Sequence, residues 1–318
     1  MPFDLSPWIA TPLGLLFLWL GAEGLVRGAS AIAGAFGVSK LVIGLTLVAF
    51  GTSLPELLVC LQAAWTGVPD VAVGNIVGSN IANVGLIVGI AALLAPLAVG
   101  TALLQRDMLW AVGAALLLLV FAWSGLMSRV EGIILLILFG VYMVTLFRAE
   151  REVMRQSESS PREPVSIPKQ ALEGVMLLGG LGLLALGAPL LVDGATSIAR
   201  HFGISELVIG LTLVAVGTSL PELATAVVAA LRGHPEIVLG NVVGSNIFNL
   251  LLVLATTAII IPVDVAGIAA VQDIPVMIGF SVMLFVMALT QRRVTRSEGA
   301  VMLALFGVYV TWLFLRGG

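Results

Sequence analysis

The sequence predicts an all-α integral membrane protein whose ten transmembrane helices form two inverted repeats of five helices each. Three observations support this fold class. Of the 318 residues, 59% are hydrophobic and only 10% are charged, and the mean hydropathy is +1.14, outside the usual range of soluble proteins. About ten apolar runs approach the roughly 20 residues that a spanning helix needs. The second half of the chain also repeats the first.

The apolar runs are separated by short polar breaks. They cover approximately residues 8–32, 41–65, 70–95, 103–123, 128–147, 170–197, 207–231, 235–261, 270–290 and 298–315. The first run has no basic flank and no small-residue cleavage site, so we expect a retained helix and no signal peptide. Cys60 is the single cysteine, which excludes a disulfide within the chain.

Basic residues predict the orientation of the ten spans. Threading the spans places most basic residues in the loops of one face: Lys40, Arg106, Arg148, Arg151, Arg155, Arg162, Lys169, Arg232, Arg292, Arg293 and Arg296. The opposite face carries only Arg129, Arg200 and Arg316. By the positive-inside rule the first face is cytoplasmic, so both termini are expected on the extracytoplasmic side.

A polar segment divides the chain into two similar halves. Residues 148–169 are rich in Ser, Pro and charges, and we expect a flexible cytoplasmic linker between residues 1–147 and 170–318. Residues 37–83 and 203–249 align without gaps at an offset of 166, with 30 identities in 47 positions. Because each half has an odd number of spans, the second half must enter the membrane from the opposite side. Inverted repeats of this kind are typical of transporters.

The first repeated motif is Gly-Thr-Ser-Leu-Pro-Glu, at Gly51–Glu56 and Gly217–Glu222. Each copy lies near the middle of an apolar run, where its proline interrupts the helix and leaves backbone carbonyls without helical partners. A carboxylate at this depth costs at least about 2.5 kcal/mol, so the default interpretation is functional. We expect broken second and seventh helices, with carbonyls near Thr52 and Thr218 available to a cation.

The second repeated motif is Gly-Asn-x-x-Gly-Ser-Asn-x-x-Asn in the third and eighth predicted spans. Ser79 and Asn83 are four residues apart and therefore share one helical face, as do their counterparts Ser245 and Asn249. A kinked helix could present these oxygens to the glutamates, so we expect breaks in helices 3 and 8 as well. Carboxylate, carbonyl and hydroxyl oxygens suit Ca²⁺ or Na⁺, and no His or Cys cluster suits a transition metal.

The paired motifs closely resemble the α-repeats of the cation/Ca²⁺ exchanger superfamily, in particular its prokaryotic Na⁺/Ca²⁺ exchangers, over nearly the whole chain. The resemblance implies a plasma-membrane antiporter, not an enzyme, that exchanges Na⁺ for Ca²⁺ by alternating access as the first and sixth spans slide across the bundle. It implies no cofactor and no nucleic-acid partner. The implied cation site comprises Glu56, Glu222, Thr52, Thr218, Ser53, Ser219, Ser79, Ser245, Asn83, Asn249, Ala49 and Ala215.

Two departures bear on the coupling ion. Some relatives carry Asp at the position of Asn249, and K⁺-dependent members have an acid there, so the amide disfavours potassium dependence. Proton-coupled relatives usually have Glu-His after the Gly-Asn pair, whereas Ile76-Val77 follows Gly74-Asn75 here, which favours sodium. The main alternative is an H⁺/Ca²⁺ or other divalent-cation antiporter that uses the same glutamates. An intramembrane hydrolase would not require the twinned Gly-Ser-Asn segments, and a cation channel would dissipate an ion gradient without requiring an ion on the opposite side.

The remaining charged residues have structural interpretations. Glu23 and Arg27 are four residues apart and predict an ion pair on the first span, although a gating role stays open. Both histidines are predicted at the surface, at span ends. Acids near expected helix starts are favoured by the helix dipole and receive no transport role: Asp107, Glu131, Asp273 and Glu298.

Overall fold

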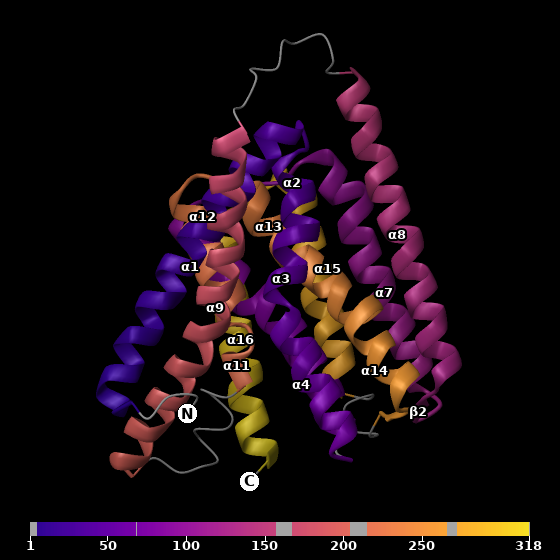
Figure 1. Cartoon of the computed structure of the whole chain (residues 1–318). Helices are drawn as coiled ribbons and strands as arrows, with labels where there is room; N and C mark the ends of the chain where they lie inside the picture. Colours follow the sequence, from indigo (N-terminus) through magenta and orange to yellow (C-terminus); the bar gives the residue numbers. More distant parts are fainter. Residues whose placement is uncertain (1–4, 68, 157–166, 204–214, 266–271, 318) are drawn as a thin grey trace.

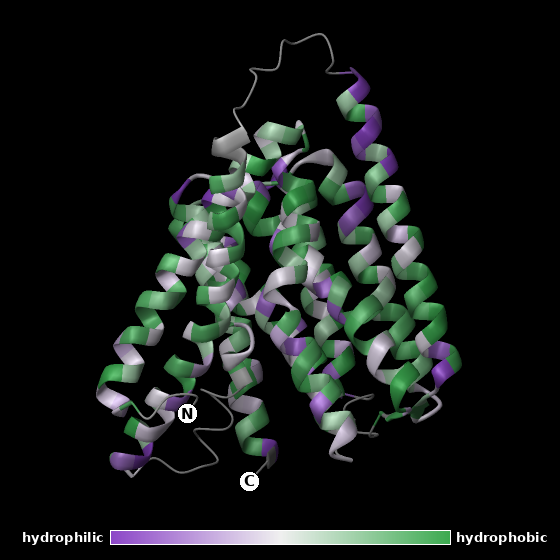
Figure 2. Cartoon of the chain, viewed as in Figure 1, coloured by the Kyte–Doolittle hydropathy of each residue, from purple (hydrophilic) through white to green (hydrophobic). Residues whose placement is uncertain are grey.

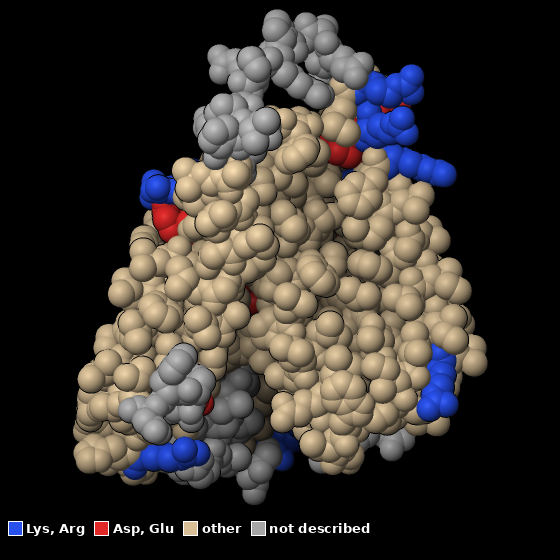
Figure 3. All heavy atoms as spheres, viewed as in Figure 1, with Lys and Arg blue, Asp and Glu red and all other residues tan. Residues whose placement is uncertain are grey.

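A computed structural model describes residues 5–67, 69–156, 167–203, 215–265 and 272–317. The described chain is a bundle of long helices, with four two-residue strands in the connections (Figure 1). Hydrophobic residues make up most of each helix, and hydrophilic ones gather mainly at the two ends of the bundle, with a few at mid-height (Figure 2). In Figure 3 a broad belt without lysine or arginine lies between these ends. This distribution fits a protein that crosses a membrane.

In the first half, α1 (Pro7–Phe36) is followed by α2 (Lys40–Ile43), the π-helical η1 (Gly44–Val48), α3 (Ala49–Thr52) and α4 (Leu54–Trp65). The chain continues through α5 (Pro69–Ala82), the π-helical η2 (Asn83–Val88), α6 (Gly89–Leu94), β1 (Leu97–Ala98), the π-helical η3 (Leu103–Asp107), α7 (Met108–Ala122), β2 (Leu126–Met127) and α8 (Arg129–Gln156).

The described elements of the second half follow a similar order. It contains α9 (Ile167–His201), α11 (Ala215–Gly217), α12 (Leu220–Leu231), α13 (Pro235–Phe248), the π-helical η5 (Asn249–Val253), α14 (Leu254–Ile260), β3 (Val263–Asp264), α15 (Ile274–Gln291), β4 (Arg293–Val294) and α16 (Arg296–Gly317).

Among the described residues, eight helices are long and apolar enough to span a membrane. The pair Lys40–Thr52 and Leu54–Trp65, bent by 41°, makes a ninth candidate. The expected seventh span, residues 207–231, lies partly outside the described residues. Residues 71–94 and 235–260 each form one span without a sharp bend, and each contains a π-helical segment, η2 or η5, where a break was expected.

The first helices of the two halves run in opposite directions. Gly14 of α1 lies against Gly187 of α9, and Gly28 lies against Leu177, so α1 and α9 run antiparallel. Glycines at this contact let the two backbones approach closely, as is common between membrane helices. Contacts between the halves also recur in pairs: β1 pairs with β4 and β2 with β3.

At the two edges of the segment expected to be a flexible linker, the described residues are helical. α8 extends to Gln156, and α9 begins at Ile167. The end of α8 is held because Glu150 is buried and accepts hydrogen bonds from the backbone and hydroxyl of Ser39, at the start of α2. Residues 157–166 lie outside the described residues.

Two of the four acids expected at helix starts form capping boxes. Glu131 accepts from the Ser128 amide at 2.6 Å, and Glu298 accepts from the Thr295 amide at 2.7 Å. Asp107 is the last residue of η3 and directly precedes α7, and its side chain makes no capping hydrogen bond there. It is fully buried and accepts hydrogen bonds from Arg106 and Tyr142.

Asp273 has a matching arrangement. It accepts a hydrogen bond from Tyr309 at 3.1 Å and pairs with Arg316 at 3.2 Å. Tyr142 and Tyr309 occupy corresponding positions on α8 and α16. The two aspartates therefore fasten the last helix of each half to the bundle.

Replacing Gly180 by alanine is expected to destabilise the contact between α1 and α9. A Cβ atom there would lie 2.5 Å from the Leu25 nitrogen and 2.6 Å from the Gly21 oxygen, both backbone atoms. Overpacking of this kind costs about 1–3 kcal/mol. The measurement is the melting temperature of the purified protein in detergent. Gly179→Ala is the matched control, because a Cβ there has no heavy atom within 4 Å; equal melting temperatures for the two variants would contradict the close packing.

Candidate cation site

Two prolines position the glutamates at the starts of buried helices. Pro55 is the second residue of α4, whose N-cap is Ser53, and Pro221 is the second residue of α12, whose N-cap is Ser219. Each proline lacks an N–H, so it cannot donate to the carbonyl of the preceding turn. Glu56 and Glu222 then fall in the first turns of α4 and α12, where the helix dipole favours a negative charge.

Both glutamates are buried near the centre of the bundle, at 1% exposure each. Within the described structure, none of their four carboxylate oxygens has a hydrogen-bond partner. The Thr218 and Ser79 hydroxyls lie close to Glu56, and those of Thr52 and Ser53 lie close to Glu222. Each carboxylate thus faces a threonine from the opposite half.

The two carboxylates are also close enough to repel each other electrostatically. A pair of buried, like-charged groups is unfavourable unless a bound cation or a proton neutralises the charge. The pair therefore forms an anionic centre that a cation would stabilise.

Further unpartnered oxygens belong to the residues that the sequence singled out. Among the described side chains, the hydroxyls of Ser53, Ser219 and Ser245 and the amide oxygens of Asn83 and Asn249 are buried without a hydrogen-bond partner. A glycine contact places Ala49 against Gly244, next to Ser245. Ala215 lies in α11, and its side chain is outside the described part of the structure.

Four asparagines that were not expected in the site connect its two halves. Thr52 donates to the Asn241 side chain at 3.1 Å, and Thr218 donates to the Asn75 side chain at 3.3 Å. Asn80 and Asn246 contact Asn249 and Asn83. These asparagines belong to the repeated Gly-Asn and Ser-Asn motifs, so the repeat was the available signal. Their partners became visible only with the two halves packed together.

One side of the site is open to a pocket of about 620 Å³ between α4 and α9. Its lining includes Thr218, Pro221 and Asp193. Figure 3 shows this face hollowed near its middle. At the other end of the bundle α1 packs along α12, and Glu23 bridges Arg27 and Arg232. The expected ion pair on the first span is confirmed.

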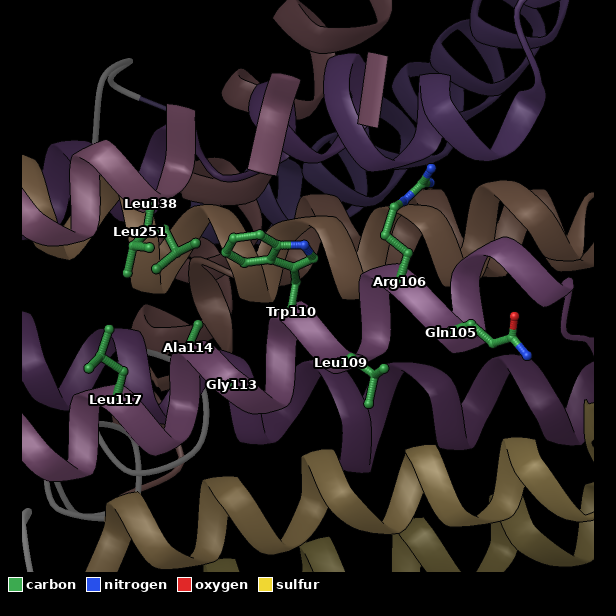
Figure 4. Close-up of a pocket in the computed structure, with 9 residues that line it drawn as sticks. All are labelled: Gln105, Arg106, Leu109, Trp110, Gly113, Ala114, Leu117, Leu138 and Leu251. Carbon is green, nitrogen blue, oxygen red and sulfur yellow. The ribbon is translucent and has the colours of Figure 1, made fainter. Parts of the chain in front are cut away.

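A second pocket, of about 430 Å³, lies beside α7 and is shown in Figure 4. Its lining is mostly apolar, apart from Arg106 and Gln105, and contains no carboxylate. It therefore lacks the ligands that a cation requires.

The histidines lie away from the glutamates. His201 packs against Trp8 and Phe202 at an end of α9. His234 precedes α13, where partial burial, reinforced by Lys40, lowers its pKa. In the described residues, no group of three or more His, Cys, Asp or Glu could hold a metal ion. Two carboxylates surrounded by hydroxyl and amide oxygens instead form a hard-oxygen set, suited to Na⁺ or Ca²⁺.

The family model described as "Sodium/calcium exchanger protein" matches the chain twice, over residues 6–148 and 173–315. The chain is 40% identical over 314 residues to the putative antiporter CaxA of Alkalimonas amylolytica, covering 95% of this chain and 97% of that protein. It is 36% identical over 339 residues to the sodium/calcium exchanger MaX1 of Methanosarcina acetivorans, with coverage of 95% and 97%.

Among solved structures, the sodium-calcium exchanger NCX_Mj soaked with zero Na⁺ and Ca²⁺ is similar to this chain throughout. The TM-score is 0.84 at 34% identity, and the match covers 96% of this chain and 98% of that chain. The likeness extends over both halves and therefore includes the membrane fold as a whole.

Replacing either glutamate by glutamine should raise the melting temperature of the cation-free protein and abolish its rise with Ca²⁺. The substitution removes an unpaired buried charge, and it also removes a cation ligand. In the unchanged protein, Ca²⁺ at about 100 times its Kd should raise the free energy of unfolding by about 2.7 kcal/mol. The measurement is thermal unfolding in detergent without Na⁺. Glu131→Gln, outside the site, serves as control; a full Ca²⁺ response in Glu56→Gln or Glu222→Gln would refute this assignment.

Proposed function

The chain belongs to the sodium/calcium exchanger protein family, and we propose that it exchanges Na⁺ for Ca²⁺ across the membrane as a secondary active antiporter. The observation that carries this proposal is the pair Glu56 and Glu222, buried at mid-bundle without hydrogen-bond partners among the described residues. The name of MaX1 as a sodium/calcium exchanger supports the same ions.

In this proposal one cation site is shared by the two halves. Its residues are Glu56, Glu222, Thr52, Thr218, Ser53, Ser219, Ser79, Ser245, Asn83, Asn249, Ala49 and Ala215. The two carboxylates supply up to four oxygens, and Thr, Ser and Asn oxygens can complete the 6 to 8 that Ca²⁺ takes. Several Na⁺ ions can neutralise the same carboxylates, so either load removes their repulsion.

Exchange follows if the site can switch from one side of the membrane to the other only while it holds an ion. A site that holds Ca²⁺ or Na⁺, but not both together, couples the two gradients when the protein alternates between two states. We assign the ten spans to two inverted five-helix repeats, with α1 and α9 as the pair that moves. With the α8 end cytoplasmic by the positive-inside rule, both termini and the pocket between α4 and α9 face the extracytoplasmic side.

A flux measurement tests the proposal and its main alternative. Purified protein in liposomes should take up radioactive Ca²⁺ when an outward Na⁺ gradient is imposed, because Na⁺ efflux supplies the driving free energy. Glu56→Gln and Glu222→Gln provide inactive controls with the same fold. Uptake that responds to a pH gradient without Na⁺ would instead identify H⁺/Ca²⁺ exchange, since a paired glutamate can carry a proton. Uptake with neither gradient would indicate a channel.

Replacing Asn249 by aspartate should raise the apparent affinity for Ca²⁺ relative to Na⁺. The substitution adds a third carboxylate beside Glu56 and Glu222, and a divalent ion gains more from the added charge than a monovalent one. The measurement is the half-saturating Ca²⁺ concentration at several Na⁺ concentrations. Asn83→Asp, at the corresponding position of the first half, is the matched comparison. Unchanged affinity and selectivity in both variants would remove these asparagines from the site.

A further inference from the structure

Four asparagine side chains meet where η2 and η5 begin. Asn80 and Asn83 come from the first half, and Asn246 and Asn249 come from the second. Asn83 Nδ2 donates to Asn246 Oδ1 at 2.9 Å, and Asn249 Nδ2 donates to Asn80 Oδ1 at 3.0 Å. All four are buried, with at most 4% exposure. Each contact crosses between the halves.

Packing alone cannot orient these amides, because the oxygen and the NH₂ group of an asparagine are nearly equal in size. Contacts with backbone carbonyls determine which way the amides of Asn80 and Asn246 face. Asn80 Nδ2 lies 3.4 Å from the backbone oxygen of Asn246, and Asn246 Nδ2 lies 3.5 Å from the backbone oxygen of Asn80. A backbone carbonyl can only accept, so the NH₂ groups of Asn80 and Asn246 must face it.

The orientation of the Asn80 and Asn246 amides determines the orientation of the other two. With their NH₂ groups on the backbone carbonyls, Asn80 and Asn246 present only their oxygens to Asn249 and Asn83. Asn249 and Asn83 must therefore point their NH₂ groups toward these oxygens and donate to them. Their Oδ1 atoms are left buried with no hydrogen-bond partner among the described residues.

We propose that Asn80 and Asn246 are positioning residues, which fix the amides of Asn249 and Asn83 so that oxygen, and not NH₂, is offered to the cation. The proposal rests on the cation site proposed above. Without the acceptor on Asn246, the Asn83 amide can turn over and bring its NH₂ group, a donor with partial positive charge, toward the ion. The same holds for Asn80 and Asn249.

A double-mutant cycle tests whether Asn246 acts through Asn83. The variants are Asn246→Leu, Asn83→Ala and the double variant, and the measurement is the half-saturating Ca²⁺ concentration of Na⁺-driven uptake. Loss of an outer residue that orients a metal ligand typically costs 10–100-fold in affinity. We expect Asn246→Leu to raise the half-saturating concentration by at least about tenfold, and to have almost no further effect once Asn83 is alanine.

The repeat provides the matched control. Asn80 acts through Asn249 in this proposal, so Asn80→Leu should keep its own effect in the Asn83→Ala background and lose it in the Asn249→Ala background. Asn246→Ala, which adds no bulk, replaces Asn246→Leu if that variant does not fold. Melting temperatures without Ca²⁺ check the fold of every variant.

Equal fold-changes for Asn246→Leu with and without Asn83 would overturn the proposal, because they would show a packing role only. This failure differs from failure of the exchange function. If the unchanged protein shows no Na⁺-driven uptake, the exchange proposal fails by itself. The same cycle can then be measured on the rise in melting temperature caused by Ca²⁺, which needs no coupling to Na⁺.

Discussion

The rest of the structure depends on the cost of two buried carboxylates that repel each other. Glu56 and Glu222 are buried, at 1% exposure each, without hydrogen-bond partners among the described residues. A buried ion without compensation costs several kcal/mol. Hydrophobic packing cannot offset this cost locally, because apolar neighbours make a charge less stable. The residues around the two glutamates therefore have to position them so that a cation can bind.

Several local features follow from that requirement. The prolines interrupt their helices one residue before each glutamate, which gives the carboxylate a helix N-terminus and frees carbonyls of the preceding turn. Glycines let the helices approach closely around the site, as Gly244 does against Ala49. Asparagines of each half then engage polar groups of the other half, so the oxygens around the glutamates are held from both sides.

The sequence was sufficient for features that the repeat or local chemistry determines, and insufficient for those that depend on docking. Glu56 and Glu222 could be found because both halves carry the same motif, and the family matches confirm that resemblance. Asn80 and Asn246 were not predicted as site residues because their partners are 163 to 169 residues away, across the interface between the halves. The helical end of α8 was missed for a similar reason: Glu150 meets Ser39 only in the folded bundle.

The repeat also bears on how evenly two states of this bundle would be populated. An exact two-fold relation would give the inward-open and outward-open forms the same energy. The charged contact at the end of the bundle away from the pocket between α4 and α9 breaks that relation, because Glu23, Arg27 and Arg232 correspond at the offset of 166 to Pro189, Asp193 and Thr66. Arg232 is nevertheless half exposed, at 49%, and exposed ion pairs contribute at most about 1 kcal/mol. Such a bias favours the described state about fivefold or less, which a transporter that has to visit both states can accommodate.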